Sequence, residues 1–339
     1  KYKILGKIGN GSFGTVYKAS KKGKKSEALA IKQVRCNAPE NVELALQEFW
    51  TLSSLQHHPN IIRFEECVQQ HPGGMKTLKH GDTNSNNYLS LVEMSIKGEL
   101  IPGFHVQHCY CKCDSKHRSA NLWFVMEYCD GGDMNDYLLS RLPLASLNSS
   151  FMIQLADGIS FLHRSNVVHR DLKPENILVR KTSKDDNSIP LLKIADFGLS
   201  KVCTTKDTSD TNVNHQWFSS ACGSDFFMAP EVFEGRYTAK ADVFALGVIF
   251  WSIMDRITFI DASTKKVLLG TYVRRDTEVL PLGEVLLDDP KLNIARLLEG
   301  TSRRKPVGEV VCMMVDASGD VRPTAEELLT MLQDVLVNP

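Results

Sequence analysis

Hydrophobic residues change their spacing along this chain, from the alternation typical of β-strands to the three- and four-residue intervals typical of helices. Alternation predicts three strands within 2–32 and one strand each at 61–68 and 122–127. Helical spacing predicts a helix at 40–55. Helical patterns dominate from Met134 onward, at 134–141, 149–164, 242–255, 282–298, 307–316 and 324–336. A passage of strands and loops from Val167 to Glu231 interrupts them. This order predicts an α+β fold, in which a small antiparallel sheet is followed by a larger helical part.

Composition narrows the classes of partner and compartment. The 339 residues carry 40 basic and 40 acidic side chains, so no long-range charge favours nucleic acid or an anionic membrane. The apolar run from Phe244 to Met254 is too short to cross a bilayer and predicts a buried helix. The nine cysteines form no Cys-x-x-Cys pair, which favours a reducing compartment, the nucleus or the cytoplasm.

A glycine-rich segment near the start is a candidate phosphate-binding loop. Gly9-Asn10-Gly11-Ser12-Phe13-Gly14 matches Gly-x-Gly-x-x-Gly, where missing side chains let backbone N–H groups approach phosphate oxygens. A dinucleotide-binding loop opens a helix, whereas Thr15-Val16-Tyr17 continues as a strand. The context favours a loop folded over ATP, and a plain glycine-rich hairpin is the alternative.

A lysine and a glutamate follow this loop at positions that suit phosphate binding. Lys32 ends the apolar run Ala30-Ile31-Lys32, where its ammonium group can meet the α- and β-phosphates. Glu48 stands on the predicted helix, spaced to pair with Lys32. The alternatives are a surface lysine with a buried stem and an exposed helix glutamate.

Two short stretches carry the residues that phosphoryl transfer requires. They are Val168-His169-Arg170-Asp171-Leu172-Lys173-Pro174-Glu175-Asn176 and Ala195-Asp196-Phe197-Gly198. One carboxylate must accept the proton of the attacking hydroxyl, and further oxygen ligands must hold magnesium. Asp171 suits the first role, and Asn176 and Asp196 suit the second.

With these motifs the chain resembles the protein kinase family from Tyr2 to about Val335. The resemblance implies the two-lobed kinase fold, with an N-lobe at 1–128 that contains an insertion at about 69–120, and a C-lobe at 129–337. It also implies that ATP and magnesium are bound and that proteins are the substrates. The ATP contacts implied by the resemblance are Ile8, Gly9, Asn10, Gly11, Ser12, Phe13, Gly14, Thr15, Val16, Ala30, Lys32, Met126, Glu127, Cys129, Asp133 and Leu178.

Further positions acquire roles from the same resemblance. Lys173 and Gly223-Ser224 resemble serine/threonine kinases, and Lys173 is expected to reach the γ-phosphate. Asp242 resembles the aspartate that anchors the catalytic loop, and Arg322 the arginine that pairs with Glu231.

An activating phosphorylation site is also expected from the resemblance. Ser220 is the candidate, with Arg170 and Lys201 as the cations that would bind its phosphate. Ser219 is a close competitor, and an unregulated surface serine is the alternative.

Within the family, two segments look like the group of kinases that interact with a PDZ-and-LIM-domain protein of actin stress fibres. These segments are Arg35–Trp50 and the late run from Tyr237 to Asp261. This finer resemblance implies a nuclear or actin-associated enzyme and a PDZ-and-LIM-domain partner.

The insertion departs from the compact family plan. It contains a cluster that can bind zinc or form a solvated loop: His105, His108, Cys109, Cys111, Cys113 and His117.

A scaffold that keeps the fold without phosphoryl transfer is a second functional hypothesis. Such a scaffold usually lacks the lysine, the base or a metal ligand, and this chain has Lys32, Asp171 and Asp196.

Overall fold

The computed structural model describes residues 1–11, 14–71, 74–79, 120–183, 188–203, 212–219, 222–262, 264–298 and 306–337. The chain divides into two compact units. The first consists of Lys1–Gln56 and Arg63–Tyr128, and the second of His57–Ile62 and Cys129–Pro339. The short segment His57–Ile62 therefore belongs with the later part of the chain, although it connects two elements of the first unit.

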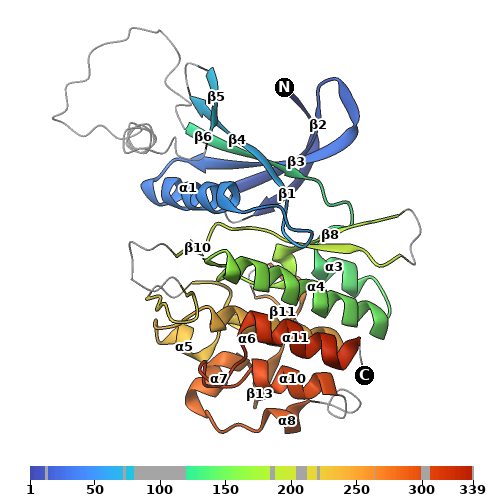
Figure 1. Ribbon diagram of the computed structural model, residues 1–339, viewed down its shortest axis with the longest axis vertical. Helices are drawn as coiled ribbons and strands as arrows, with labels where there is room; N and C mark the ends of the chain where they lie inside the picture. The colour runs from blue at the N-terminus through green and yellow to red at the C-terminus, as the bar shows by residue number, and fades with distance from the viewer. Residues whose placement is uncertain are drawn as a thin grey trace, which may run out of the picture. The chain divides into compact units, whose positions relative to one another are not determined.

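A six-stranded antiparallel sheet forms most of the first unit, in the order β1-β2-β3-β6-β4-β5 (Figure 1). Its strands are β1 (Tyr2–Gly11), β2 (Gly14–Lys21), β3 (Lys24–Cys36), β4 (Phe64–His71), β5 (Gly74–Leu78) and β6 (Ala120–Glu127). The end of β4 and all of β5 lie inside the range predicted as insertion, so the sheet continues further than the alternation indicated.

The two faces of β3 have different neighbours because successive side chains of a strand alternate. Leu29 and Ile31 join Ala19 and Val125 in a buried cluster on one face. Lys32 points to the other face, toward α1 (Pro39–Ser54), which packs on β3 and β4 (Figure 1). Proline at the first turn suits a helix start, since its missing N–H would have no partner there.

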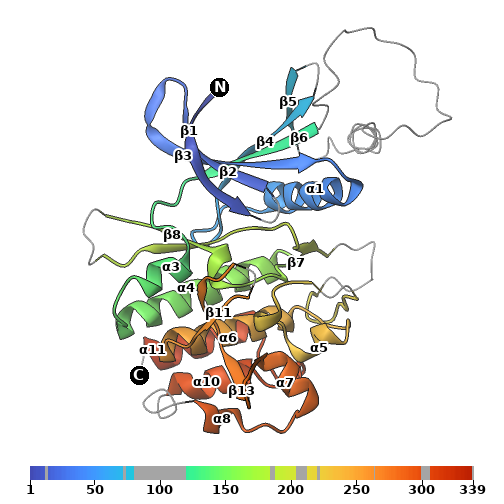
Figure 2. The same cartoon turned by 180° about the vertical axis from the view of Figure 1, so that it is seen from behind.

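Helices dominate the second unit, as the spacing predicts (Figure 2). They are α3 (Met134–Leu139), α4 (Ala145–Arg164), α5 (Pro230–Phe233), α6 (Lys240–Asp255), α7 (Leu282–Asp288), α8 (Ile294–Leu297), α10 (Pro306–Met314) and α11 (Ala325–Leu336). Every residue of α6 from Ala241 to Ile253 is buried, and α4 and α10 pack against it. The helix predicted to be buried is thus the centre of this unit's core. In the part of the chain that the structure describes, no helix is both long and apolar enough to span a membrane.

Short strands and turns place the functional loops of this unit. They are β7 (Val167–Val168), β8 (Ile177–Arg180), β9 (Leu191–Ile194), β10 (Lys201–Val202) and the 3-10 turns η1 (Pro174–Asn176) and η2 (Asp225–Phe227). Four further strands were not predicted, and they form two hairpins after α6. These are β11 (Thr258–Ile260) with β12 (Val267–Leu269), and β13 (Tyr272–Arg275) with β14 (Glu278–Pro281).

Candidate active site

Lys32 and Glu48 form a buried ion pair in the first unit. Lys32 Nζ lies 2.8 Å from both carboxylate oxygens of Glu48, and their side chains are 9% and 3% exposed. The predicted pairing is therefore present. The glutamate holds the lysine on the face of β3 opposite the Leu29–Ile31 cluster, with its charge compensated away from water.

The glycine-rich segment is a strand–turn–strand hairpin. Gly9 pairs with Val16, Asn10 with Thr15 and Gly11 with Gly14, while Ser12 and Phe13 lie outside the described residues. A Cβ on Gly14, where φ is +152°, would lie 2.0 Å from the carbonyl oxygen of Gln33, so a side chain does not fit. A strand follows this glycine, which confirms the prediction that the segment is not a dinucleotide-binding loop.

The remaining residues expected to contact ATP are divided between the two units. Ala30 pairs with Met126 across β3 and β6, and Ile8 lies on β1, all in the first unit. Glu127, also in the first unit, is buried and accepts a hydrogen bond from the backbone N–H of Arg63 at 2.8 Å.

Three of these residues belong to the second unit. Cys129 is buried, and Asp133 and Leu178 form an isolated β-bridge. Asp133 caps α3 by accepting a hydrogen bond from Asp136 N at 2.9 Å. Burial raises the pKa of the Asp133 carboxyl above its ordinary value, and the neighbouring Asp136 carboxylate adds to the increase, although the hydrogen bond from Asp136 N opposes it.

Three side chains converge on the carboxylate of Asp171 in the second unit. The Ser224 hydroxyl donates to Oδ1 at 3.0 Å, and Asn176 Nδ2 donates to Oδ2 at 2.9 Å. Lys173 Nζ lies 3.0 Å from Oδ2 and donates to Ser224 Oγ at 2.7 Å. Asp171 is 7% exposed, so its carboxylate is held in one orientation with little contact to water.

Asn176 and Asp196 lie on neighbouring segments. Asn176 Nδ2 donates to the Asp171 backbone oxygen at 2.8 Å as well as to its carboxylate, which identifies the amide oxygen as the atom that can bind a cation. The backbone N–H of Ala195 donates to Asn176 O at 2.9 Å, which brings Asp196 next to this loop. Asp196 has φ of +63°, an uncommon conformation for a residue with a side chain.

A buried aspartate on α6 holds the backbone just before Asp171. Asp242 accepts hydrogen bonds at 2.9 Å from His169 N, Arg170 N and the His163 ring. Burial alone would raise the pKa of Asp242, but the hydrogen bond from His163 and the nearby histidines and N–H groups lower it by more, so it lies below the ordinary value. Arg170 has φ of +68°, and these bonds hold that strained backbone in place.

Comparison with known proteins decides the family. Residues 2–332 match the family described as Protein kinase domain. The chain belongs to the protein kinase family. Serine/threonine-protein kinase ATG1a of Arabidopsis thaliana is 29% identical to it over 311 residues, 90% of this chain and 39% of the relative. Serine/threonine-protein kinase atg1 of Dictyostelium discoideum is 38% identical over 135 residues, 39% of this chain and 18% of the relative.

These relatives test two levels of the sequence prediction. They confirm the predicted class, a serine/threonine protein kinase, and the predicted α+β kinase fold. They do not support the finer resemblance to kinases that interact with a PDZ-and-LIM-domain protein, since both are described as Atg1 kinases. This kinase chain spans less than half the length of either relative.

The donor set of the kinase fits magnesium. Magnesium prefers oxygen ligands, and Asp196 contributes a carboxylate and Asn176 an amide oxygen on adjoining backbone segments. The hydrogen bonds from Asn176 Nδ2 to Asp171 aim that amide oxygen away from the base. These two residues would therefore hold the ion, whereas Asp171 is engaged by Ser224, Lys173 and Asn176.

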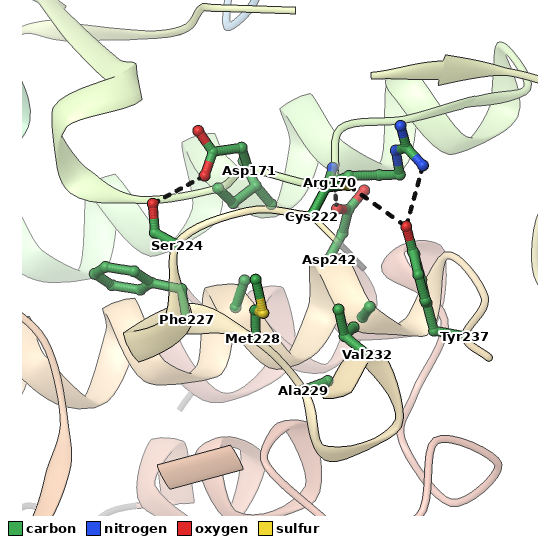
Figure 3. A pocket seen from close by; sticks show the side chains of 13 residues that line it. Arg170, Asp171, Cys222, Ser224, Phe227, Met228, Ala229, Val232, Tyr237 and Asp242 are labelled. Carbon is green, nitrogen blue, oxygen red and sulfur yellow. Dashed lines mark hydrogen bonds between the residues drawn. The ribbon is translucent and has the colours of Figure 1, made fainter. Parts of the chain in front are cut away.

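The contact of Ser224 with Asp171 is a feature of the site that sequence reasoning missed. The Gly223-Ser224 pair was recognised as a mark of serine/threonine kinases, but its contact with Asp171 joins segments far apart in the chain. The glycine allows the approach, because φ is +115° there and a Cβ would lie 2.6 Å from Arg170 O. Below this contact a small cavity is lined by Cys222, Phe227 and Tyr237 among others, as Figure 3 shows.

The expected phosphorylation site and the Cys/His cluster lie outside the described residues, at Ser220 and within 80–119. Of the two cations assigned to the phosphate, Arg170 donates to Leu199 O at 2.6 Å and to the Tyr237 hydroxyl at 3.1 Å. Lys201 Nζ lies 5.6 Å from the centre of the Phe218 ring. Among described residues, no group of three or more His, Cys, Asp or Glu side chains is arranged to hold a metal ion.

Proposed function

We propose that this chain transfers the γ-phosphoryl group of ATP to serine and threonine hydroxyls of proteins, with Asp171 as the general base. The observation that carries the proposal is the orientation of the Asp171 carboxylate by Ser224, Lys173 and Asn176. A carboxylate held in this way can accept a hydroxyl proton with little reorganisation.

In the proposed reaction, the acceptor oxygen forms a bond to the γ-phosphorus while the bond from that phosphorus to the bridging oxygen of ADP breaks. Asp171 orients the acceptor hydroxyl and takes its proton. Lys173, 3.0 Å from Asp171 Oδ2, places a positive charge beside the base, where it can stabilise negative charge on the transferred group. Lys32, held by Glu48, is assigned to the α- and β-phosphates. Magnesium, when bound, neutralises phosphate charge.

The test compares the parent with Asp171→Asn, using magnesium-ATP and a panel of dephosphorylated casein, histone and myelin basic protein. We expect phosphoserine or phosphothreonine in the parent reaction by mass spectrometry and a loss of several orders of magnitude in Asp171→Asn. Both proteins should show the same thermal shift with magnesium-ATP and none with NAD, because the substitution removes proton acceptance and little volume. A shift with ATP but no transfer by the parent would instead favour the scaffold.

Two finer proposals rest on the sequence alone. We propose that the chain acts in the nucleus or cytoplasm, and that it binds a PDZ-and-LIM-domain protein associated with actin. The motifs at Arg35–Trp50 and Tyr237–Asp261 support the second, while the Atg1 relatives do not. Fluorescence microscopy of the tagged protein tests the first, and co-precipitation with purified PDZ-and-LIM-domain proteins tests the second. Exclusion from both compartments, or no binding, would refute them.

A further inference from the structure

The β11–β12 hairpin is a short element whose stability must come from its neighbours. It pairs three residues of each strand, Thr258–Ile260 with Val267–Leu269. A two-stranded hairpin alone is marginally stable in water, so side chains packed against the rest of the fold must hold it. Phe259 and its cross-strand partner Leu268 are each 8% exposed, whereas Ile260 and Val267 are 69% and 48% exposed. The face of Phe259 and Leu268 is therefore buried, whereas the opposite face is exposed at Ile260 and Val267 and buried at Leu269, which is 0% exposed.

Phe259 packs on the loop that follows Ser224. Its ring stacks on that of Phe226, with centroids 3.9 Å apart and planes inclined by 14°. Gly270, just after the hairpin, allows a close fit, since a Cβ there would lie 2.6 Å from the Phe259 ring and 3.4 Å from the Phe227 ring. The hairpin thus contacts Phe226, and Gly270 at its end lies beside Phe227.

The other side of the hairpin is fixed to two helices. Asn135 of α3 donates to Val267 O at 3.1 Å and accepts from Leu269 N at 2.8 Å, and it is 1% exposed. Thr271 donates to Val248 O of α6 at 3.3 Å. These bonds fix the hairpin that carries Phe259 to α3 and α6 in the core of the unit.

The contacted loop leads directly to the catalytic carboxylate. Phe226 lies in η2, two residues after Ser224, and Ser224 bonds both Asp171 and Lys173. A shift of η2 would move the Ser224 hydroxyl away from Asp171 Oδ1. The stacked rings therefore connect the β11–β12 hairpin to the orientation of Asp171, which the acceptor hydroxyl must reach in the proposed reaction.

We propose that Phe259 is a positioning residue of the kinase, which braces the loop Cys222–Met228 through Phe226 and so sets the affinity for the acceptor protein. This inference rests on the proposed phosphotransferase function. It makes the hairpin after α6 a part of acceptor recognition, although its residues do not touch the base.

The test compares Phe259→Ala and Phe226→Ala with the double variant, and uses Phe259→Tyr to restore the ring. Ile260→Ala, a change at the exposed neighbour on the same strand, is the matched control. KM and kcat are measured for dephosphorylated casein and for ATP, and hydrogen exchange is measured for the amides of residues 222–228.

We expect each alanine variant to raise KM for casein by about three- to tenfold, as suits the loss of one aromatic pair, and to lower kcat because Ser224 moves away from Asp171, with KM for ATP unchanged. The double variant should be no worse than the single ones, because both remove the same contact. Exchange should quicken at 222–228 but not in α4. Phe259→Tyr and Ile260→Ala should resemble the parent.

Unchanged casein kinetics and unchanged exchange in Phe259→Ala would overturn the proposal. Equal increases in KM for ATP and casein would also overturn it, because they would indicate a general loss of structure. If Phe259→Ala does not fold, Phe226→Ala on the half-buried side of the stack gives the same readings. If the parent transfers no phosphate, the phosphotransferase function fails, and unchanged exchange at 222–228 would separately refute the brace.

Discussion

At the scale of single residues, Ser224 is placed to control the rate of phosphoryl transfer. It donates to Asp171 and accepts from Lys173, so it connects the base with the cation beside it. Ser224→Ala should lower kcat by about tenfold to a hundredfold, the range expected for losing a hydrogen bond to a charged group. Ser224→Thr keeps the hydroxyl and should retain most activity. Equal kcat values for the parent and Ser224→Ala would show that the hydrogen bond from Ser224 to Asp171 does not contribute to catalysis.

The Lys32–Glu48 pair gives a second prediction, because removing one member takes from the other its buried opposite charge at 2.8 Å. Glu48→Gln should lower the free energy of unfolding by about 3–5 kcal/mol and reduce kcat/KM. The double variant Lys32→Met with Glu48→Leu should recover most of the stability and none of the activity. Urea denaturation and a phosphotransfer assay separate the two effects. If Glu48→Gln were harmless in both, another group would have to balance Lys32.

Among the residues of the site, those with a required chemistry at a required spacing were predictable. The Lys32–Glu48 pairing is an example, because a strand and the next helix present them at matching positions. The contact between Ser224 and Asp171 was not predictable, since it depends on how the intervening segment folds back. The spacing of residues that are close in sequence does not show where the chain folds back on itself.

At the scale of elements, regular spacing predicted the longer strands and helices, and short elements escaped it. Strands of three or four residues, such as β11 and β13, are too short for alternation to be visible. The range 282–298, predicted as one helix, is two, because Pro290 follows Asp289 and cannot continue α7. The stacking of Phe259 on Phe226 stabilises β11 from outside, and only the tertiary structure reveals it.

The ion pair between Glu231 of α5 and Arg322, which precedes α11, gives a prediction at this scale. Arg322 is 1% exposed and bonds both carboxylate oxygens of Glu231 at 2.6 and 2.9 Å, while also donating to Asp316 O at 2.8 Å. Lysine has the charge but not the planar fork. Arg322→Lys should therefore lower the free energy of unfolding by about 2–4 kcal/mol in urea denaturation.

The control for this change is Arg296→Lys, at an exposed arginine of α8. It should alter stability by less than about 0.5 kcal/mol, as surface substitutions usually do. A similar small effect for Arg322→Lys would mean that one ammonium group can replace the whole set of bonds, and that the fork geometry does not matter here.

At the scale of the whole molecule, the residues assigned to ATP and catalysis are shared by the two units. Lys32, Glu48 and the glycine hairpin belong to the first, and Asp171, Asn176 and Asp196 to the second. The spacing of hydrophobic residues predicted a sheet-rich part and a helical part. It did not predict that His57–Ile62 belongs with the helical part, where Ile62 N bonds Ile194 O at 2.9 Å.

The response of stability to acid follows from Asp242, which anchors the catalytic loop within the second unit. Its pKa is lower in the folded chain than in the unfolded chain, so the unfolded chain binds more protons as the pH falls toward the ordinary aspartate pKa of about 3.9. The stability that Asp242 contributes is thus complete above that value and is lost as the pH falls through the pKa that Asp242 has in the folded chain.

Asp242→Asn should destabilise the protein strongly at pH 7 and progressively less, relative to the parent, toward pH 3, as measured by urea denaturation across this range. Asp288→Asn, at an exposed carboxylate, should show a small difference at every pH. A gap between parent and Asp242→Asn that stayed constant from pH 7 to pH 3 would show that Asp242 acts through its shape alone and not through its charge.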